Sequence, residues 1–251
     1  MEEELGGGGL TRVVRVGETV RRSAGPWTPS VHALLEHLRG VGFSGAPRVL
    51  GVEAEQEVLE FIPGETTDDY DDGALAAAAR LVRAYHDAVA TFAPPRDAAW
   101  QFLVGAPRDG EIVCHNDLAP ANTILRRGEP VAFVDWDLAA PGPRLWDVAY
   151  AAYRFIPLYD DESYARLGIP ARPRAPRLRL FCDAYGLDDS SGLLATIRAR
   201  VVSLYETARM WGTEGRPGWA DVWRDTRGEQ WLASVRYLDA YRDAFDAALG
   251  G

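Results

Sequence analysis

The chain has 251 residues, of which 47% are hydrophobic and 25% are charged, and this balance excludes a disordered or collagen-like protein. Its formal net charge of −10 argues against nucleic acid or an anionic membrane as a partner, because binding to phosphates requires clustered positive charge. No apolar run approaches the roughly 20 residues of a membrane-spanning helix, and Met1 to Leu10 lacks a signal pattern, so we expect a cytoplasmic protein.

The side-chain inventory limits the available chemistry. All 27 residues counted as lysine plus arginine are arginines, so any step that needs a lysine must be adapted to arginine. Without a secretion signal, Cys114 and Cys182 are predicted to be free buried thiols rather than a disulfide.

The first 62 residues carry mostly strand patterns. Alternating β-branched stretches over 11–16 and 18–22 meet at Gly17-Glu18, which suits a tight hairpin. The other elements predicted in this part are a helix over 29–39 and strands over 48–52 and 57–62.

The second part, which starts after a break at Pro63-Gly64, is predicted to be mainly helical. A long amphipathic helix over 75–92 ends before Pro94 and Pro95, which cannot continue it. Three short strands and two more helical stretches follow, over 111–114, 123–126, 131–134, 194–211 and 231–245. The sequence thus predicts an α+β fold.

A polar motif lies among these short strands. His115-Asn-Asp-Leu-Ala-Pro-Ala-Asn122 fits the His-x-Asp-Leu-x-x-x-Asn spacing of kinase catalytic loops, and Asp135 ends the next apolar strand. Phosphoryl transfer needs a carboxylate near the nucleophile and separate oxygen ligands for the magnesium that bridges the phosphates. We therefore expect Asp117 to accept the hydroxyl proton of a substrate, and Asn122 and Asp135 to bind Mg²⁺. The alternative is a helix cap at Asn122 and two exposed loop acids.

The run from Phe133 to Tyr150, Phe-Val-Asp-Trp-Asp-Leu-Ala-Ala-Pro-Gly-Pro-Arg-Leu-Trp-Asp-Val-Ala-Tyr, extends this motif. With it, the chain resembles the aminoglycoside phosphotransferase and choline kinase-like family over nearly its whole length. The resemblance implies the two-lobed protein-kinase-like fold. It implies a β-rich nucleotide-binding lobe over 1–62 and a larger, mainly helical catalytic and substrate-binding lobe over 63–251.

The same resemblance implies a role for each residue of the motif. Asp117 would be the catalytic base, Asn122 and Asp135 the magnesium ligands, Asp147 an acid that braces the catalytic loop, and His115 a second structural residue. The short distance from Asp135 to Asp147 leaves little room for the activation loop of a protein kinase, so a small-molecule acceptor fits better.

The residues that would bind the nucleotide lie in the first part of the chain and form no motif. The glycine run 6–9, with Gly8 and Gly9 as candidate ligands, indicates either a loop over the phosphates or a flexible terminal segment. The family holds the phosphates with a lysine on the third strand. Only arginine is present here, and strand alternation favours Arg22 over Arg21.

Two further features of this side follow from the resemblance. The helix partner of the strand cation would be either His32 or Glu36, and both are equally compatible with an exposed helix face. Glu60, Phe61 and Ile62 look like the hinge, whose backbone would bond the adenine.

The acceptor side has no motif. The acids Asp160, Asp161 and Glu162 and the aromatic ring of Trp211 would suit an amine-bearing acceptor through charge pairing and cation–π contact. The alternative is that these acids form a solvated surface and that the tryptophan packs in the core.

Together these observations predict an enzyme that uses ATP or GTP with Mg²⁺ to phosphorylate a hydroxyl of a small molecule. The acceptor would be an aminoglycoside or another amine-bearing metabolite, which would place the protein among antibiotic-resistance enzymes. Two rivals are a catalytically weak nucleotide-binding regulator, suggested by the missing lysine, and a module that only binds a cationic ligand.

Overall fold

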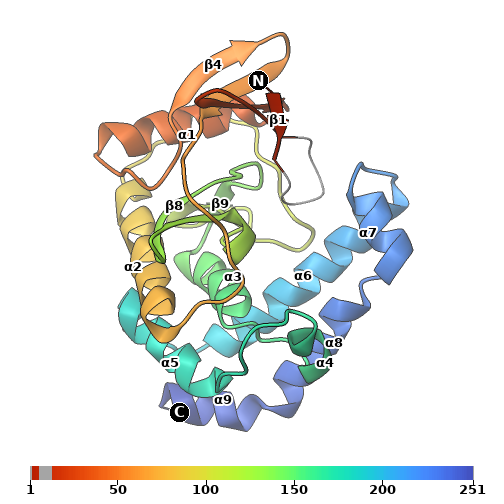
Figure 1. Ribbon diagram of the computed structural model, residues 1–251. Helices are drawn as coiled ribbons and strands as arrows, with labels where there is room; N and C mark the ends of the chain where they lie inside the picture. The colour runs from red at the N-terminus through yellow and green to blue at the C-terminus, as the bar shows by residue number, and fades with distance from the viewer. Residues whose placement is uncertain (1, 6–12, 251) are drawn as a thin grey trace.

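The computed structural model describes residues 2–5 and 13–250. The first part is an antiparallel five-stranded sheet in the order β1-β2-β3-β5-β4, seen at the top of Figure 1. Its strands are β1 (Glu2–Glu4), β2 (Val14–Val16), β3 (Thr19–Ser23), β4 (Val49–Glu53) and β5 (Gln56–Glu60). Helix α1 (Thr28–Gly40) lies beside this sheet and comes between β3 and β4 in the chain.

The predicted hairpin is present between β2 and β3. Gly17 takes a φ of 61° at its turn, a conformation that glycine adopts without steric cost. β3 then pairs with β5, and in that register Arg22 stands directly opposite Glu57. This cross-strand pair is almost fully buried, with both side chains at most 5% exposed.

Two helices build the core under the sheet. α1 buries Val31, Leu34, Leu35 and Leu38, which recur at helical spacing. α2 (Asp72–Val89) begins at Asp71, whose side chain accepts the N–H of Ala74 at 2.8 Å, and it ends before the two prolines as predicted. Its buried face is Leu75, Ala78, Ala79, Val82, Tyr85, His86 and Val89.

Short strands occupy the centre of the molecule. They are β6 (Ile112–Cys114), β7 (Thr123–Arg126), β8 (Glu129–Phe133) and β9 (Ala140–Gly142), with a 3-10 turn, η1 (Pro120–Asn122), before β7. β7 and β8, which lie close to the strands predicted over 123–126 and 131–134, pair as a hairpin, while β6 pairs with β9, a strand that the sequence did not indicate. α3 (Arg144–Phe155) follows β9 and is buried along most of its length.

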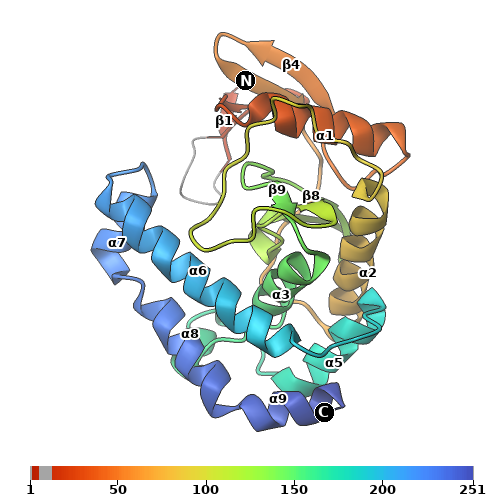
Figure 2. The same cartoon turned by 180° about the vertical axis from the view of Figure 1, so that it is seen from behind.

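Helices make up the rest of the chain. They are α4 (Asp161–Ala165), α5 (Arg174–Tyr185), α6 (Leu193–Thr213), α7 (Trp219–Thr226), α8 (Glu229–Ala240) and α9 (Arg242–Leu249). Figure 2 shows α6 running across the molecule from the end near α5 to α7.

One expectation about these helices was wrong. The apolar rhythm over 231–245 predicted one helix, but the chain turns at Tyr241, which leaves the helical region with φ −106° and ψ 15°. α8 and α9 both place apolar residues at helical spacing, so the pattern could not show the break.

The cysteines and the apolar segments were both subjects of expectations. Cys114 and Cys182 are free and buried, as predicted. Over residues 2–5 and 13–250, no helix has the length and apolar character needed to cross a membrane.

Candidate active site

The loop between β6 and β7 carries Asp117. The side-chain N–H of Asn122 donates to Asp117 Oδ2 at 2.7 Å and also to the Asp117 carbonyl oxygen at 3.0 Å. Tyr150, from α3, donates its hydroxyl to Asp117 Oδ1 at 2.9 Å. Since both carboxylate oxygens accept a hydrogen bond, the orientation of this acid is fixed.

The backbone of this loop is held from two sides. The fully buried Asp147 accepts the N–H of His115 at 2.8 Å on one oxygen and the N–H of Asn116 at 2.9 Å on the other. Arg200, from α6, donates to the carbonyl oxygen of Asn116 at 2.5 Å. Asn116 itself has a φ of 63°, a left-handed conformation that asparagine tolerates better than most residues. Asp147 therefore lies where a loop-bracing acid was expected.

The ionisation of Asp147 is set by its neighbours. Burial acts to raise the pKa of this carboxyl, but the hydrogen bond and charge of His86 and the N–H of His115 outweigh it and hold the pKa below its usual range. His86 Nε2 lies 3.2 Å from Asp147 Oδ2, and His86 Nδ1 lies 2.8 Å from the Tyr185 hydroxyl.

His115 is packed inside the protein. Its ring lies 4.3 Å from that of Trp136 between centroids, and its Nδ1 accepts the N–H of Asp117 at 3.2 Å. Burial lowers the pKa of the imidazole, against the effect of the nearby acids. Its position suits the structural role that the resemblance implied.

Arg22 reaches into the same site from β3. It donates from Nε to Glu57, from Nη1 to Asp135 Oδ1 at 2.7 Å and from Nη2 to Asp137 Oδ1 at 2.7 Å. Arg21 points to the opposite face of the strand, where it pairs with Glu53 at 3.0 Å. The alternation of the strand therefore selects Arg22, as expected.

The expectation of a direct ion-pair partner on helix α1 was wrong. Glu36 is exposed, and His32 contacts Glu57 rather than Arg22, with Nε2 at 3.0 Å from Glu57 Oε2. The acid comes instead from β5, because the antiparallel register sets Glu57 opposite Arg22. Burial acts to raise the pKa of Glu57, but the bonds and charges of His32 and Arg22 lower it overall.

Asp137 is a third acid beside Arg22 that the sequence reasoning missed. Burial raises its pKa to about 6, although the charge of Arg22 acts in the opposite direction. Three carboxylates around one guanidinium leave excess negative charge, which a divalent cation would relieve. In the described ranges 2–5 and 13–250, no three or more His, Cys, Asp or Glu side chains are grouped as a metal site.

The candidate donors of a metal site are nevertheless well oriented. The amide nitrogen of Asn122 is turned toward Asp117, which leaves its oxygen for a cation. Asp135, at 43% side-chain exposure, uses one oxygen for Arg22 and keeps the other free for a ligand. An amide oxygen and a carboxylate are hard donors that suit Mg²⁺.

Two of the three backbone N–H groups expected to bond the adenine already have partners. The N–H of Glu60 donates to the carbonyl oxygen of Arg48 and the N–H of Phe61 to the carbonyl oxygen of Glu18, both at 2.9 Å. This leaves Ile62 as the residue of the expected hinge whose N–H makes no backbone bond within the described residues. Gly8 and Gly9, the expected phosphate-loop glycines, lie outside the described residues.

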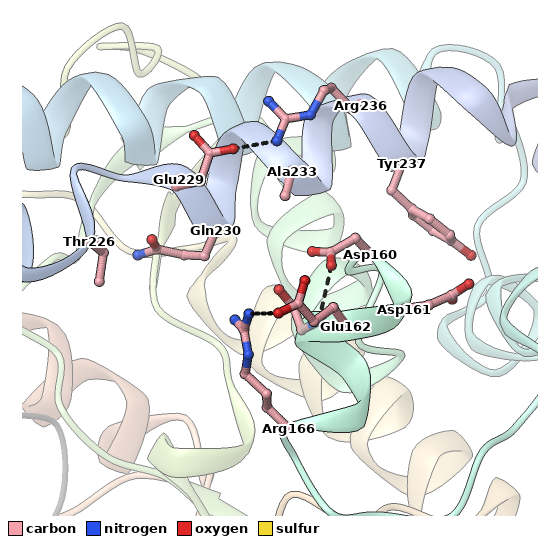
Figure 3. Close-up of a pocket in the computed structure, with 11 residues that line it drawn as sticks. Asp160, Asp161, Glu162, Arg166, Thr226, Glu229, Gln230, Ala233, Arg236 and Tyr237 are labelled. Carbon is pink, nitrogen blue, oxygen red and sulfur yellow. Dashed lines mark hydrogen bonds and ion pairs between the residues drawn. The ribbon is translucent and has the colours of Figure 1, made fainter.

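The residues expected on the acceptor side are only partly brought together. Asp160, Asp161 and Glu162 line an open cavity of about 810 Å³ between α4 and α8, and Figure 3 shows them facing side chains of α8. Trp211 does not line it. That residue is 3% exposed and packs edge-on against Trp219, with centroids 5.4 Å apart, because its place on α6 continues the buried face of that helix. Its assignment to the substrate site was wrong.

Several residues of the site carried no usable sequence signal. They are Glu57 of β5, Asp137 in the loop after β8, Tyr150 and Arg154 of α3, and Arg200 of α6, and they have no motif spacing. Only Asp137 and Tyr150 fell within the run that carried the resemblance, and Asp137 was the one that its acidic character next to Asp135 could have identified.

Comparison with known proteins identifies the family of this chain. The profile of a family described as "Phosphotransferase enzyme family" matches residues 96–183. A trifolitoxin immunity protein of Rhizobium leguminosarum bv. trifolii is 32% identical over 261 residues, which cover 98% of this chain and 97% of that protein.

Solved structures show the same fold at low identity. An ethanolamine kinase of Plasmodium vivax superposes with a TM-score of 0.64 at 14% identity, covering 97% of this chain and 84% of that one. The GDP and kanamycin complex of an aminoglycoside phosphotransferase, APH(2")-IIia, gives 0.61 at 12% identity, covering 97% and 93%. The chain therefore belongs to the phosphotransferase enzyme family and has its protein-kinase-like fold.

Proposed function

We propose that this protein transfers the γ-phosphoryl group of ATP or GTP, with Mg²⁺, to a hydroxyl of a small molecule. The observation that carries the proposal is that two bonded pairs, Asn122 with Asp117 and Arg22 with Asp135, lie at one site. They are joined because the N–H of Val134, the neighbour of Asp135, donates to the carbonyl oxygen of Asn122 at 2.9 Å. In this proposal the sheet part, 1–62, binds the nucleotide and 63–251 supplies the catalytic loop and the acceptor site.

The metal would be held by Asn122 and Asp135, with Asp137 adding negative charge behind them. When bound, Mg²⁺ supplies charge neutralisation for the phosphates. Arg22 adds a fixed positive charge on the sheet side, and Glu57 and Asp137 keep its guanidinium in place.

Asp117 is the residue that handles the proton. Its orientation is fixed by Asn122 and Tyr150, and its carboxylate accepts the proton of the acceptor hydroxyl. The hydroxyl oxygen forms the new bond to phosphorus, the bond from phosphorus to the nucleoside diphosphate oxygen breaks, and the diphosphate leaves with that electron pair.

The relative named for immunity to a toxin supports a biological setting for this reaction. Phosphorylation of a hydroxyl adds charge and bulk to a small molecule, so it would prevent a toxin from binding its target. We place the acceptor on the side of Asp117 that faces α3, near the cavity between α4 and α8.

Asp117→Asn tests the proposal. The amide keeps the shape but cannot accept the proton, so ADP release with a responsive acceptor should fall by roughly a hundredfold or more. Calorimetric affinity for MgATP should stay within about twofold, because the nucleotide contacts come from other residues. The exposed Asp188→Asn is the matched control and should keep full turnover.

Turnover at the normal rate in the Asp117→Asn variant would remove Asp117 from the base role. Tight binding of MgATP by the normal protein with no turnover on any acceptor would instead favour a nucleotide-binding regulator.

A further inference from the structure

Arg154 lies one residue away from the proposed base in the hydrogen-bond network. It comes from the last turn of α3 and donates from Nη1 to the Tyr150 hydroxyl at 2.7 Å, and Tyr150 in turn donates to Asp117. Its Nε donates to the Tyr159 hydroxyl at 2.9 Å. The guanidinium therefore contacts two phenol hydroxyls, one of which bonds the reacting carboxylate.

Among the described residues, no carboxylate contacts this guanidinium directly, although the charge of Asp117 acts on it across Tyr150. Across residues 2–5 and 13–250, the arginines outside any ion pair are exposed to solvent, except Arg154 and Arg200. Both of these flank Tyr150, and Arg200 lies over its ring at 4.2 Å. A shielded cation without a counterion is costly, and such groups are concentrated at functional sites.

The two arginines differ in what they can reach. Arg200 is fully buried, and its unpartnered Nε and Nη1 are sealed from solvent, so it can act only on the loop. Arg154 is partly exposed, and Nη2 has no hydrogen-bond partner in the described part of the chain and is not sealed. Arg154 can therefore receive a ligand.

The cavity between α4 and α8, whose lining begins at the residue after Tyr159, has most of its acids paired with arginines. Glu162 pairs with Arg166 at 2.5 Å, Glu229 pairs with Arg236, and Asp161 pairs with Arg174 at 2.9 Å, and Figure 3 shows the first two pairs. Asp160, the remaining acid of this lining, accepts the N–H of Ser163 on one oxygen, and its other oxygen is buried without a hydrogen-bond partner among the described residues. The acids that suggested an amine-bearing acceptor are thus mostly neutralised by the protein itself.

We infer that Arg154 binds an oxyanion group of the acceptor, a carboxylate, sulfate or phosphate, next to the hydroxyl that Asp117 serves. This inference rests on the proposed function and names its substrate class: small molecules that carry both a hydroxyl and an acidic group. A guanidinium matches such a group with two parallel N–H bonds, and Arg154 has unused N–H groups on Nη1 and Nη2.

Anion binding tests the inference without knowledge of the acceptor. The protein is first saturated with Mg²⁺ and a non-hydrolysable ATP analogue, so that the phosphate site is filled. It is then titrated calorimetrically with malonate and, separately, with sulfate. The same titrations are repeated without nucleotide. We expect Arg154→Met to weaken this binding at least about tenfold and Arg154→Lys to retain part of it. The exposed Arg198→Met, whose partner is Asp239, is the matched control and should bind as the normal protein does. Melting temperatures confirm that each variant is folded.

Turnover supplies the second test. Acceptors are compared in pairs that differ by one acid group, glycerate against glycerol and gluconate against glucose, with ethanolamine and kanamycin as cations. We expect the acid member to have the higher kcat/KM, and Arg154→Met to remove that preference mainly through KM. The inference would be overturned if no anion binds, or if Arg154→Met binds anions as tightly as the normal protein does. It would also be overturned if neutral or cationic acceptors are used as well as acidic ones, or if Arg154→Met lowers kcat by the same factor for every acceptor. Loss of Mg-nucleotide binding or of all turnover is a different result, which counts against the proposed function.

Discussion

At the scale of single residues, Arg22 stands on the strand where the family has a lysine, and its partner acids differ as well. Arg22 has a planar guanidinium with N–H groups in several directions, so it contacts Glu57, Asp135 and Asp137 at once. One of these partners, Glu57, is almost fully buried and belongs to the neighbouring strand and not to α1. Strand pairing therefore sets Glu57 opposite this cation, and α1 contributes through His32, which contacts Glu57 and not Arg22.

Glu57→Gln should test this anchoring. The amide leaves the buried guanidinium with one charged partner fewer, so we expect a loss of about 1–3 kcal/mol in the free energy of unfolding and weaker nucleotide binding. Urea unfolding and calorimetric titration of MgATP measure the two effects. Glu36→Gln, on the exposed face of α1, should change neither. If Glu36→Gln has the same effects as Glu57→Gln, Glu57 is not the residue that holds Arg22 in place.

The sequence located the residues that follow one another in a motif, and it missed those that meet only in space. Asp117, Asn122 and Asp135 were found because a loop and the following hairpin keep them close along the chain. Glu57 and Arg200 reach the site from β5 and α6, and no local pattern distinguishes them from structural residues. A buried charge is recognised as functional only when its surroundings are known.

At the scale of elements, the catalytic loop is held between two helices. Asp147 of α3 accepts the N–H groups of His115 and Asn116, and Arg200 of α6 donates to the carbonyl oxygen of Asn116. Ionised side chains of opposite sign thus hold consecutive backbone groups, and such bonds are stronger than neutral ones. The left-handed conformation of Asn116 is maintained by these contacts.

Asp147→Asn should loosen this arrangement. An amide has a single acceptor oxygen, so at least one buried N–H loses its partner, and we expect a loss of about 3 kcal/mol in the free energy of unfolding at neutral pH. The pKa of the Asp147 carboxyl is lower in the folded than in the unfolded chain. Its contribution is therefore complete above the unfolded value of about 4 and is lost as the pH falls toward the folded value.

Urea unfolding at several pH values checks both parts of this expectation. The difference between the normal protein and the Asp147→Asn variant should shrink as the pH falls below about 4. The exposed Asp246→Asn should show no comparable difference. A difference that stays constant down to the lowest pH would mean that packing around Asp147, and not its charge, braces the loop.

At the scale of the whole molecule, periodicity predicted most elements and none of the arrangement between them. The sheet and its hairpin, α1, α2 and α6 lie close to their expected ranges, because a buried face at regular spacing is visible in the sequence. β9, α4 and α7 are short and gave no clear period, and the turn at Tyr241 is invisible to a rhythm that continues on both sides. How the sheet meets the centre, which brings Arg22 to Asp135, came only from the tertiary structure.

The contact of Arg22 on the sheet with Asp135 after β8 lies where a bound nucleotide would touch both parts of the chain. A nucleotide held by Arg22 on one side and by Asn122 and Asp135 on the other would join the two parts of the chain, so it should stabilise them together. A ligand at about one hundred times its Kd adds roughly 2.7 kcal/mol, which for a chain of this size corresponds to a rise in Tm of roughly 5–10 °C. Asp135→Ala should abolish the part of this rise that depends on Mg²⁺, measured as the difference between scans with MgATP and scans with ATP plus a chelator. The exposed Asp97→Ala should retain it in full. If the magnesium-dependent rise survives in the Asp135→Ala variant, Asp135 is not a metal ligand and Asp137 becomes the acid to examine in its place.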